Sequence, residues 1–215
     1  MTKDEVRQRI LDVRIVPVVR ANTAELALQA SQAVAEGGIP IVEITMTVPG
    51  AIEVIRQLRA SAPELLVGAG TVLDAATARQ CVNAGAQFLV SPGFKRSTVR
   101  FARREGVLMI AGSLTPTEVI EAWEAGSDFV KIFPCGNLGG PCYIKALKAA
   151  LPQIPMIPTG GVNLTTVGPF MLAGAAALGV GGELVSASAM KCGHLEEITA
   201  LARQFVEALK QVTFT

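Results

Sequence analysis

Short apolar runs alternate with longer amphipathic segments along the whole chain. The runs consist mainly of Val, Ile, Leu, Ala and Phe, which is typical of strands buried on both faces. We expect eight strands, at 14–20, 41–45, 65–71, 88–92, 108–111, 128–134, 156–159 and 177–180. The segments between them carry the period of amphipathic helices. A short helix is expected at 3–12, and eight more at 24–36, 49–60, 75–84, 97–105, 115–126, 141–151, 164–173 and 194–211.

Glycine ends most of the expected helices and is followed at once by the next apolar run, as at Gly85, Gly106 and Gly126. This strict alternation of strand and helix predicts a parallel sheet covered by helices. Eight such units favour an α/β fold of the (β/α)8 TIM-barrel type, with an extra N-terminal helix, as a single domain over residues 1–215. A doubly wound open sheet is the alternative.

The composition excludes several classes of protein. The 215 residues are 50% hydrophobic and 17% charged, with a net charge of +1, so no surface for nucleic acid is indicated. Four widely spaced cysteines and one histidine form neither a zinc motif nor a disulfide framework, and we expect no metal site. The charged N-terminus is unlike a secretory signal and no apolar run reaches membrane-spanning length, so we expect a soluble, cytoplasmic protein.

Two ionisable residues, Glu43 and Lys131, interrupt otherwise apolar strands. Burial disfavours the charged form of a lysine and frees its amine for nucleophilic attack. A lysine with a neighbouring carboxylate as proton carrier fits an imine mechanism. Two other interpretations stay open: a lysine on an edge strand that points to water, and a structural Glu–Lys ion pair, which stabilises a fold weakly compared with apolar packing.

In a barrel of this kind, functional residues stand where the strands end and the following loops begin. The residues in these positions are Arg20, Thr45, Thr47, Thr71, Ser91, Pro92, Ser113, Thr159, Gly160, Gly161, Gly179, Gly181, Gly182 and Glu183. The two glycine pairs leave backbone N–H groups near helix starts, which suits a phosphate, although tight turns explain them as well. The arginine is either an anion clamp or a solvated strand end.

The chain resembles the 2-keto-3-deoxy-6-phosphogluconate (KDPG) and 4-hydroxy-2-oxoglutarate (KHG) aldolases, a family that includes a phosphogalactonate branch. The resemblance spans nearly the whole chain and rests on five segments in the same order along the strands. They are Val42-Glu43-Ile44-Thr45, Gly68-Ala69-Gly70-Thr71-Val72-Leu73, Val90-Ser91-Pro92-Gly93, Phe129-Val130-Lys131-Ile132-Phe133-Pro134 and Pro158-Thr159-Gly160-Gly161-Val162. The combination is specific, whereas a single segment such as Thr-Gly-Gly is not.

The resemblance implies a class I Schiff-base aldolase that uses no metal and no cofactor and forms a homotrimer. Lys131 would form an imine with C2 of a keto acid, and Glu43 would act as general acid and base. The substrate would be KDPG, and the products would be pyruvate and glyceraldehyde 3-phosphate. Residues that match the family's substrate-binding positions are Thr71 for the pyruvate carboxylate, Thr159 for a substrate hydroxyl, Pro92 and Phe133 for the pocket wall, and Gly160, Gly161, Gly181 and Gly182 for the phosphate.

Two positions depart from the family pattern. Thr47 stands where many of the phosphogluconate enzymes carry an arginine that helps to bind the carboxylate, so either Arg20 replaces it or the keto acid is bound more weakly. Glu183 stands where a serine often follows the second glycine pair, and an acid there would repel a phosphate unless it points away or pairs with a cation. Cleavage of KHG to pyruvate and glyoxylate, and cleavage of the phosphogalactonate isomer, therefore remain alternatives.

Functions of other classes also fit parts of the pattern. A phosphate-binding barrel isomerase or synthase uses similar glycine loops but has no need of a buried lysine. A flavin-binding barrel also uses a Thr-Gly-Gly segment, and the purified protein would then be yellow. A non-catalytic sensor of carbohydrate acids is a third possibility, although no DNA-binding segment is evident in the sequence.

Overall fold

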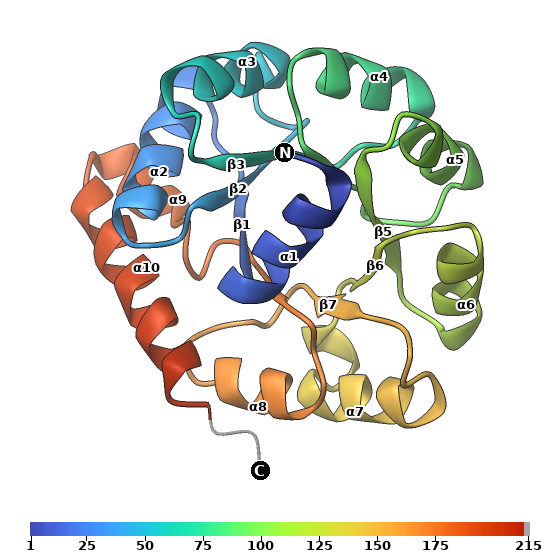
Figure 1. Ribbon diagram of the computed structural model, residues 1–215. Helices are drawn as coiled ribbons and strands as arrows, with labels where there is room; N and C mark the ends of the chain where they lie inside the picture. The colour runs from blue at the N-terminus through green and yellow to red at the C-terminus, as the bar shows by residue number, and fades with distance from the viewer. Residues whose placement is uncertain (213–215) are drawn as a thin grey trace.

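Eight parallel strands form a ring in the computed structural model, which describes residues 1–212 (Figure 1). The strands are β1 (Ile15–Val19), β2 (Ile41–Thr45), β3 (Leu66–Gly70), β4 (Phe88–Val90), β5 (Leu108–Ser113), β6 (Phe129–Ile132), β7 (Met156–Pro158) and β8 (Leu178–Val180). From β1 to β7 each strand pairs with the next one along the chain, and β8 returns to pair with β1. A bridge between Thr159 and Gly179 closes the ring. The barrel prediction is confirmed, and the open sheet is excluded.

Helices surround the ring on its outer side (Figure 1). They are α2 (Ala24–Glu36), α3 (Ala51–Ser61), α4 (Ala75–Asn83), α5 (Arg96–Arg104), α6 (Pro116–Glu124), α7 (Pro141–Ala150), α8 (Val167–Leu172), α9 (Ala187–Cys192) and α10 (Leu195–Lys210), with a 3₁₀ turn η1 (Gly136–Leu138). The first helix, α1 (Lys3–Val13), is not part of this outer layer. Side-chain caps fix several starts: Thr23, Asp74 and Thr115 each accept a hydrogen bond from a backbone N–H in the first turn.

The expected elements are all present, most of them with shifted ends. The helix expected at 164–173 begins only at Val167, because the side chain of Asn163 accepts hydrogen bonds from the N–H groups of Thr165 and Thr166 and forms a turn there. The strand expected at 128–134 ends at Ile132. The sequence prediction missed η1 and α9. Six residues of α9, mostly small, give no clear helical period, and its cap at Ser186 is the one signal.

The barrel interior is apolar at the end where the strands begin. Side chains from seven strands fill it, and Val6 and Ile10 of α1 pack against them; the strand residues are Val16, Ile41, Leu66, Phe88, Val90, Leu108, Ile110, Phe129 and Ile157. In Figure 1, α1 lies across the centre of the ring. The extra N-terminal helix therefore closes this end of the barrel, which leaves the carboxyl ends of the strands for a site.

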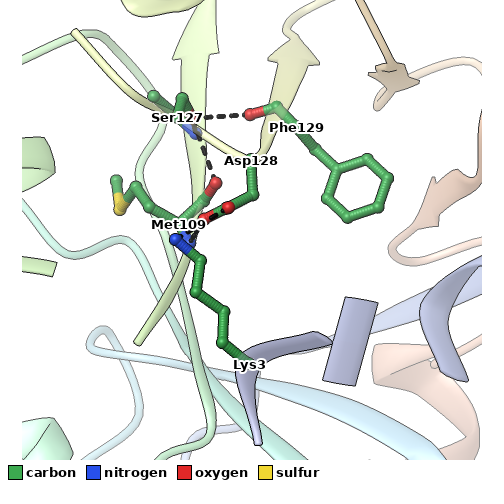
Figure 2. Close-up of polar contacts among 6 residues, drawn as sticks. Lys3, Met109, Ser127, Asp128 and Phe129 are labelled. Atoms are coloured by element: carbon green, nitrogen blue, oxygen red, sulfur yellow. Dashed lines mark hydrogen bonds and ion pairs between the residues drawn. The ribbon is translucent and has the colours of Figure 1, made fainter. Parts of the chain in front are cut away.

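Polar contacts join α1 to the start of β6 (Figure 2). Lys3 Nζ lies 2.8 Å from Oδ1 of Asp128, whose Oδ2 accepts a hydrogen bond of 2.9 Å from the N–H of Met109. Next to it, the hydroxyl of Ser127 donates to the carbonyl oxygens of Met109 and Phe129 and accepts from the N–H of Ala111. These contacts fix how β6, the lysine-bearing strand, starts beside β5.

Replacement of Asp128 by alanine is expected to lower the free energy of unfolding by about 2 kcal/mol. The change removes the ion pair with Lys3 and leaves the N–H of Met109 without its side-chain acceptor, and the loss of a partner for a largely buried group costs about 1–3 kcal/mol. The control is Lys3→Met, which removes only the ion pair and is expected to cost less than about 1 kcal/mol. Urea unfolding measures both, and equal losses would contradict the assigned role of Asp128.

Candidate active site

Lys131 and Glu43 meet inside the barrel. They come from β6 and β2, which are not neighbours in the ring, so the two side chains reach toward each other across the interior. The distance from Lys131 Nζ to Glu43 Oε1 is 3.8 Å, and the two side chains are only 5% and 3% exposed. Lys131 therefore does not lie on an edge strand and does not point to water.

The side-chain carboxyl group of Glu43 is not fully hydrogen-bonded. Its Oε1 is buried and has no hydrogen-bond partner among residues 1–212. Burial raises the pKa of Glu43 above its ordinary value, and the positive charges of Lys131 and Arg20 oppose that rise without cancelling it. A buried carboxyl group whose pKa is raised in this way can hold a proton and release it, which a general acid and base must do.

Glycine in β3 makes room for this pair. A Cβ atom on Gly70 would lie 1.9 Å from Oε1 of Glu43, closer than any contact allows, so no other residue fits without moving the carboxylate. Similarly, a Cβ on Gly179 of β8 would lie 2.2 Å from the hydroxyl oxygen of Thr159. A glycine inside a strand is the sequence signal of such a close approach, and the sequence prediction did not use it at these two positions.

The side chains around the pair are held by local contacts. Lys131 Nζ lies 5.3 Å from the centre of the Phe133 ring, which places the aromatic ring beside the amine. The hydroxyl of Thr45 donates to the carbonyl oxygen of Val19 and lies 2.7 Å from the hydroxyl of Thr47. Thr45 is buried and Thr47 is exposed, so this contact links the barrel interior to its rim.

A cavity of about 250 Å³ opens at the carboxyl ends of the strands. Its lining brings together nine of the expected site residues, Arg20, Phe133, Thr159, Gly160, Gly161, Gly179, Gly181, Gly182 and Glu183, with Val18 and Val162. A Cβ on Gly181 would lie 3.9 Å from Nη1 of Arg20, so the guanidinium group extends beside this glycine pair. Glu183 is exposed on the same lining, which leaves one positive and one negative side chain at this end of the cavity.

The remaining expected residues lie outside that lining. Pro92 is half-buried after β4, and its backbone packs so closely on Gly112 of β5 that a Cβ there would lie 2.2 Å away. Thr71 is half-buried after β3 and adopts a left-handed backbone with φ of 58°, which is unusual for a β-branched residue and marks a constrained turn. Thr45 stands at the end of β2, two residues from Glu43.

Residues 1–212 contain neither a candidate metal site nor a helix that could span a membrane. Within 1–212, no three His, Cys, Asp or Glu side chains are grouped so that they could hold a metal ion. In the same range, no helix has the length and apolar character needed to cross a membrane.

Comparison with known proteins identifies the family. The family model described as "KDPG and KHG aldolase" matches residues 6–201. The chain belongs to this family of aldolases, which are carbon–carbon lyases. It is 36% identical to the 2-dehydro-3-deoxy-phosphogluconate aldolase of Treponema pallidum over 91% of this chain and 93% of that protein. It is 33% identical to the KHG/KDPG aldolase of Escherichia coli K12, over 91% and 92% of the two chains.

Solved structures of aldolases have the same fold. The KDPG aldolase of Legionella pneumophila, crystallised with pyruvate captured as a covalent carbinolamine intermediate, superposes with a TM-score of 0.85 at 30% identity and covers 92% of this chain and 96% of that one. A structure described as native KDPGal gives a TM-score of 0.85 at 32% identity over 92% and 95% of the chains. A 3-hexulose-6-phosphate synthase at 19% identity, with a TM-score of 0.72, shows the shared barrel fold alone.

Proposed function

We propose that this aldolase cleaves KDPG to pyruvate and glyceraldehyde 3-phosphate through an imine on Lys131. The observation that carries the proposal is the buried amine of Lys131, 3.8 Å from a buried carboxyl group whose pKa is raised. A structural ion pair would stabilise the fold less than apolar residues of the same size. A nucleophilic amine beside a proton carrier, in contrast, is the arrangement that imine chemistry requires.

The reaction begins when Nζ of Lys131 adds to the C2 carbonyl carbon of the keto acid. Glu43 in its protonated form donates a proton to the carbinolamine hydroxyl, which leaves as water, and the protonated imine remains. Glu43 then accepts the proton of the C4 hydroxyl, so C4 departs as the aldehyde while the electron pair of the C3–C4 bond moves toward the imine nitrogen. Glu43 returns this proton to C3 of the enamine, and water hydrolyses the imine to pyruvate and free amine.

The raised pKa of Glu43 suits this cycle, since the same carboxyl group must donate in two steps and accept in two: it takes the proton of the C4 hydroxyl and, at the end, the proton released when water hydrolyses the protonated imine. The aromatic ring of Phe133 beside the amine covers one side of the reacting carbon. Other residues would bind the two ends of the substrate, the keto acid and the end farthest from C2. We assign this binding to the residues already described: Arg20, Thr45, Thr71, Pro92, Thr159, Gly160, Gly161, Gly181 and Gly182. Covalent capture of pyruvate by the Legionella pneumophila aldolase supports an imine route for this chain as well.

KHG is the second candidate substrate, and Glu183 is the observation that favours it. The acid lines the cavity with Arg20, so the charge of the guanidinium group is offset where a phosphate would bind. KHG has no phosphate and would be less affected. We favour KDPG because two glycine pairs with exposed backbone line the same end of the cavity. The ratio of kcat/KM values for KDPG, KHG and the phosphogalactonate isomer decides between them.

Borohydride trapping tests the imine. The protein is incubated with pyruvate and reduced with borohydride. Intact-mass spectrometry then measures the added mass, and peptide mapping locates the modified residue. One reduced pyruvate adduct per chain, on Lys131, is expected, and incubation with acetate, which has no ketone, should give none. A folded protein without an adduct would overturn the imine mechanism and return Lys131 to a structural role.

We also propose that the aldolase is a homotrimer, on the basis of its family resemblance. A designed cage that fuses symmetric oligomeric domains matches this chain at 32% identity with a TM-score of 0.84, covering 93% of this chain and 73% of that one. Light scattering measures the mass in solution, and a monomer would contradict the proposal.

A further inference from the structure

A groove between α4 and α5, on the outer wall of the barrel, gathers four arginines. It has a volume of about 370 Å³ and is lined by Ala75, Arg79, Arg96, Ser97, Arg100, Phe101 and Arg104. Arg79 comes from α4, and the other three come from α5, where they follow one another at four-residue intervals. Residues spaced in this way lie on one face of a helix, so α5 turns a row of guanidinium groups toward α4.

Three of these arginines lie over aromatic rings. Arg79 and Arg104 lie over the ring of Phe101, with their Cζ atoms 5.6 and 5.5 Å from the ring centre. Arg96 lies in the same way over Phe94, at 5.7 Å. Phe101 is only 5% exposed, so its ring is anchored in the protein. A guanidinium group that contacts an aromatic ring can still donate hydrogen bonds from its N–H groups to a ligand, and the contact favours its position over the ring.

Most of the positive charge in this groove is not paired with a carboxylate. Arg104 pairs with Glu105 at 3.0 Å, but the ion pairs found in residues 1–212 include none for Arg79, Arg96 or Arg100. The positive charge of Lys95, the residue before α5, acts on the carboxylate of Asp74 at the start of α4 and is therefore partly offset. Four of the twelve arginines in the sequence line this one groove, although the whole chain has a net charge of only +1.

We propose that this groove binds a small oligophosphate anion, that is, a chain of linked phosphates as in a nucleoside triphosphate or inorganic triphosphate. A single phosphate carries a charge of about −2, too little for four arginines. Arg96 and Arg104 are separated by roughly 12 Å along α5, at about 1.5 Å per residue, a span that suits several phosphates in line. Arginine also binds phosphate oxygens through two parallel hydrogen bonds.

The aromatic residue in the groove argues against a nucleic-acid strand as the ligand. Single-stranded nucleic acid is bound by exposed aromatic side chains on which bases stack. Phe101 is the one aromatic residue of the lining, and its ring is buried beneath the arginines. The groove therefore offers contacts to phosphate oxygens and none to stacked bases.

Isothermal titration with inorganic triphosphate and with ATP, at 50 and 150 mM salt, tests the proposal. Binding of one anion per chain is expected, and it should weaken as salt is raised. The double variant Arg79→Gln, Arg100→Gln should bind at least tenfold more weakly. Arg203→Gln is the control, because it removes an exposed arginine from α10, on the opposite side of the barrel, and it should leave binding unchanged (Figure 1).

Equal affinity for both probes would show that the phosphate chain alone is recognised, and tighter binding of ATP would show that the nucleoside contributes; both outcomes support the site. Thermal unfolding and aldolase turnover of each variant confirm that it is folded, since the groove lies outside the active site. The proposal is overturned if triphosphate does not bind to the folded protein, or if Arg203→Gln weakens it as much as the double variant. Tighter binding of a single-stranded oligonucleotide than of triphosphate would overturn it as well.

Discussion

Replacement of Lys131 by methionine is expected to abolish aldolase turnover, with a loss on the order of 10⁴-fold or more in kcat, the scale on which removal of a covalent nucleophile acts. Methionine has nearly the length of lysine and fills the same buried volume, but it has no amine to attack C2 of the keto acid. The variant should fold, because burial already favours the neutral form of Glu43 and the loss of the Lys131 charge raises the pKa of Glu43 further.

The measurement is steady-state pyruvate release, together with the borohydride adduct of the same sample. Lys145→Met is the matched control: the same substitution at an exposed position of α7, which should keep both turnover and adduct. Circular dichroism and thermal unfolding establish that each variant is folded. If folded Lys131→Met released pyruvate at the rate of the unmodified chain, the imine mechanism would be wrong, and another amine or another reaction would have to account for the activity.

The order of elements was readable from the sequence because parallel strands buried on both faces are apolar runs, and because glycine or a capping side chain marks the helix ends. The helix at 24–36 and the strand at 41–45 were predicted with the bounds that the structure has. In contrast, α9 was missed, since a six-residue helix of small side chains contributes no apolar face from which a period could be recognised.

The candidate site was predictable only in part. An ionisable residue in an apolar strand stands out in the sequence, so Glu43 and Lys131 could be selected as a pair. Their 3.8 Å separation could not be derived, because it depends on closure of the ring and on the rotamers of two side chains from non-neighbouring strands. The gap left by Gly70 for the carboxylate and the position of Glu183 on the cavity lining likewise depend on tertiary packing.

Replacement of Glu43 by glutamine is expected to lower kcat by about 10²–10⁴-fold, the usual contribution of a general acid and base. Glutamine keeps the shape of the side chain but cannot give or take a proton. The imine should still form slowly, so the pyruvate adduct on Lys131 persists while turnover falls. Pre-steady-state trapping alongside turnover measures both, and Glu121→Gln at an exposed position of α6 is the control. If the Glu43→Gln variant turned over substrate at the rate of the unmodified chain, Glu43 would not be the general acid and base.

The raised pKa of Glu43 also predicts how the free energy of unfolding depends on pH, and the same variant tests this. Burial raises the folded-state pKa of Glu43 above 4.5, so the folded protein holds this proton more tightly than the unfolded chain does. The stabilisation is therefore complete below about pH 4.5 and is lost as the pH rises through the folded-state pKa. Glutamine does not titrate, so Glu43→Gln should gain stability relative to the unmodified chain as the pH is raised across this window. Urea unfolding at a series of pH values measures the difference, and a difference that is constant or falls with pH would contradict the raised pKa. The buried carboxyl group of Glu43 is thus expected to lower the stability of the barrel at neutral pH, which is the cost that its proposed role in proton transfer would explain.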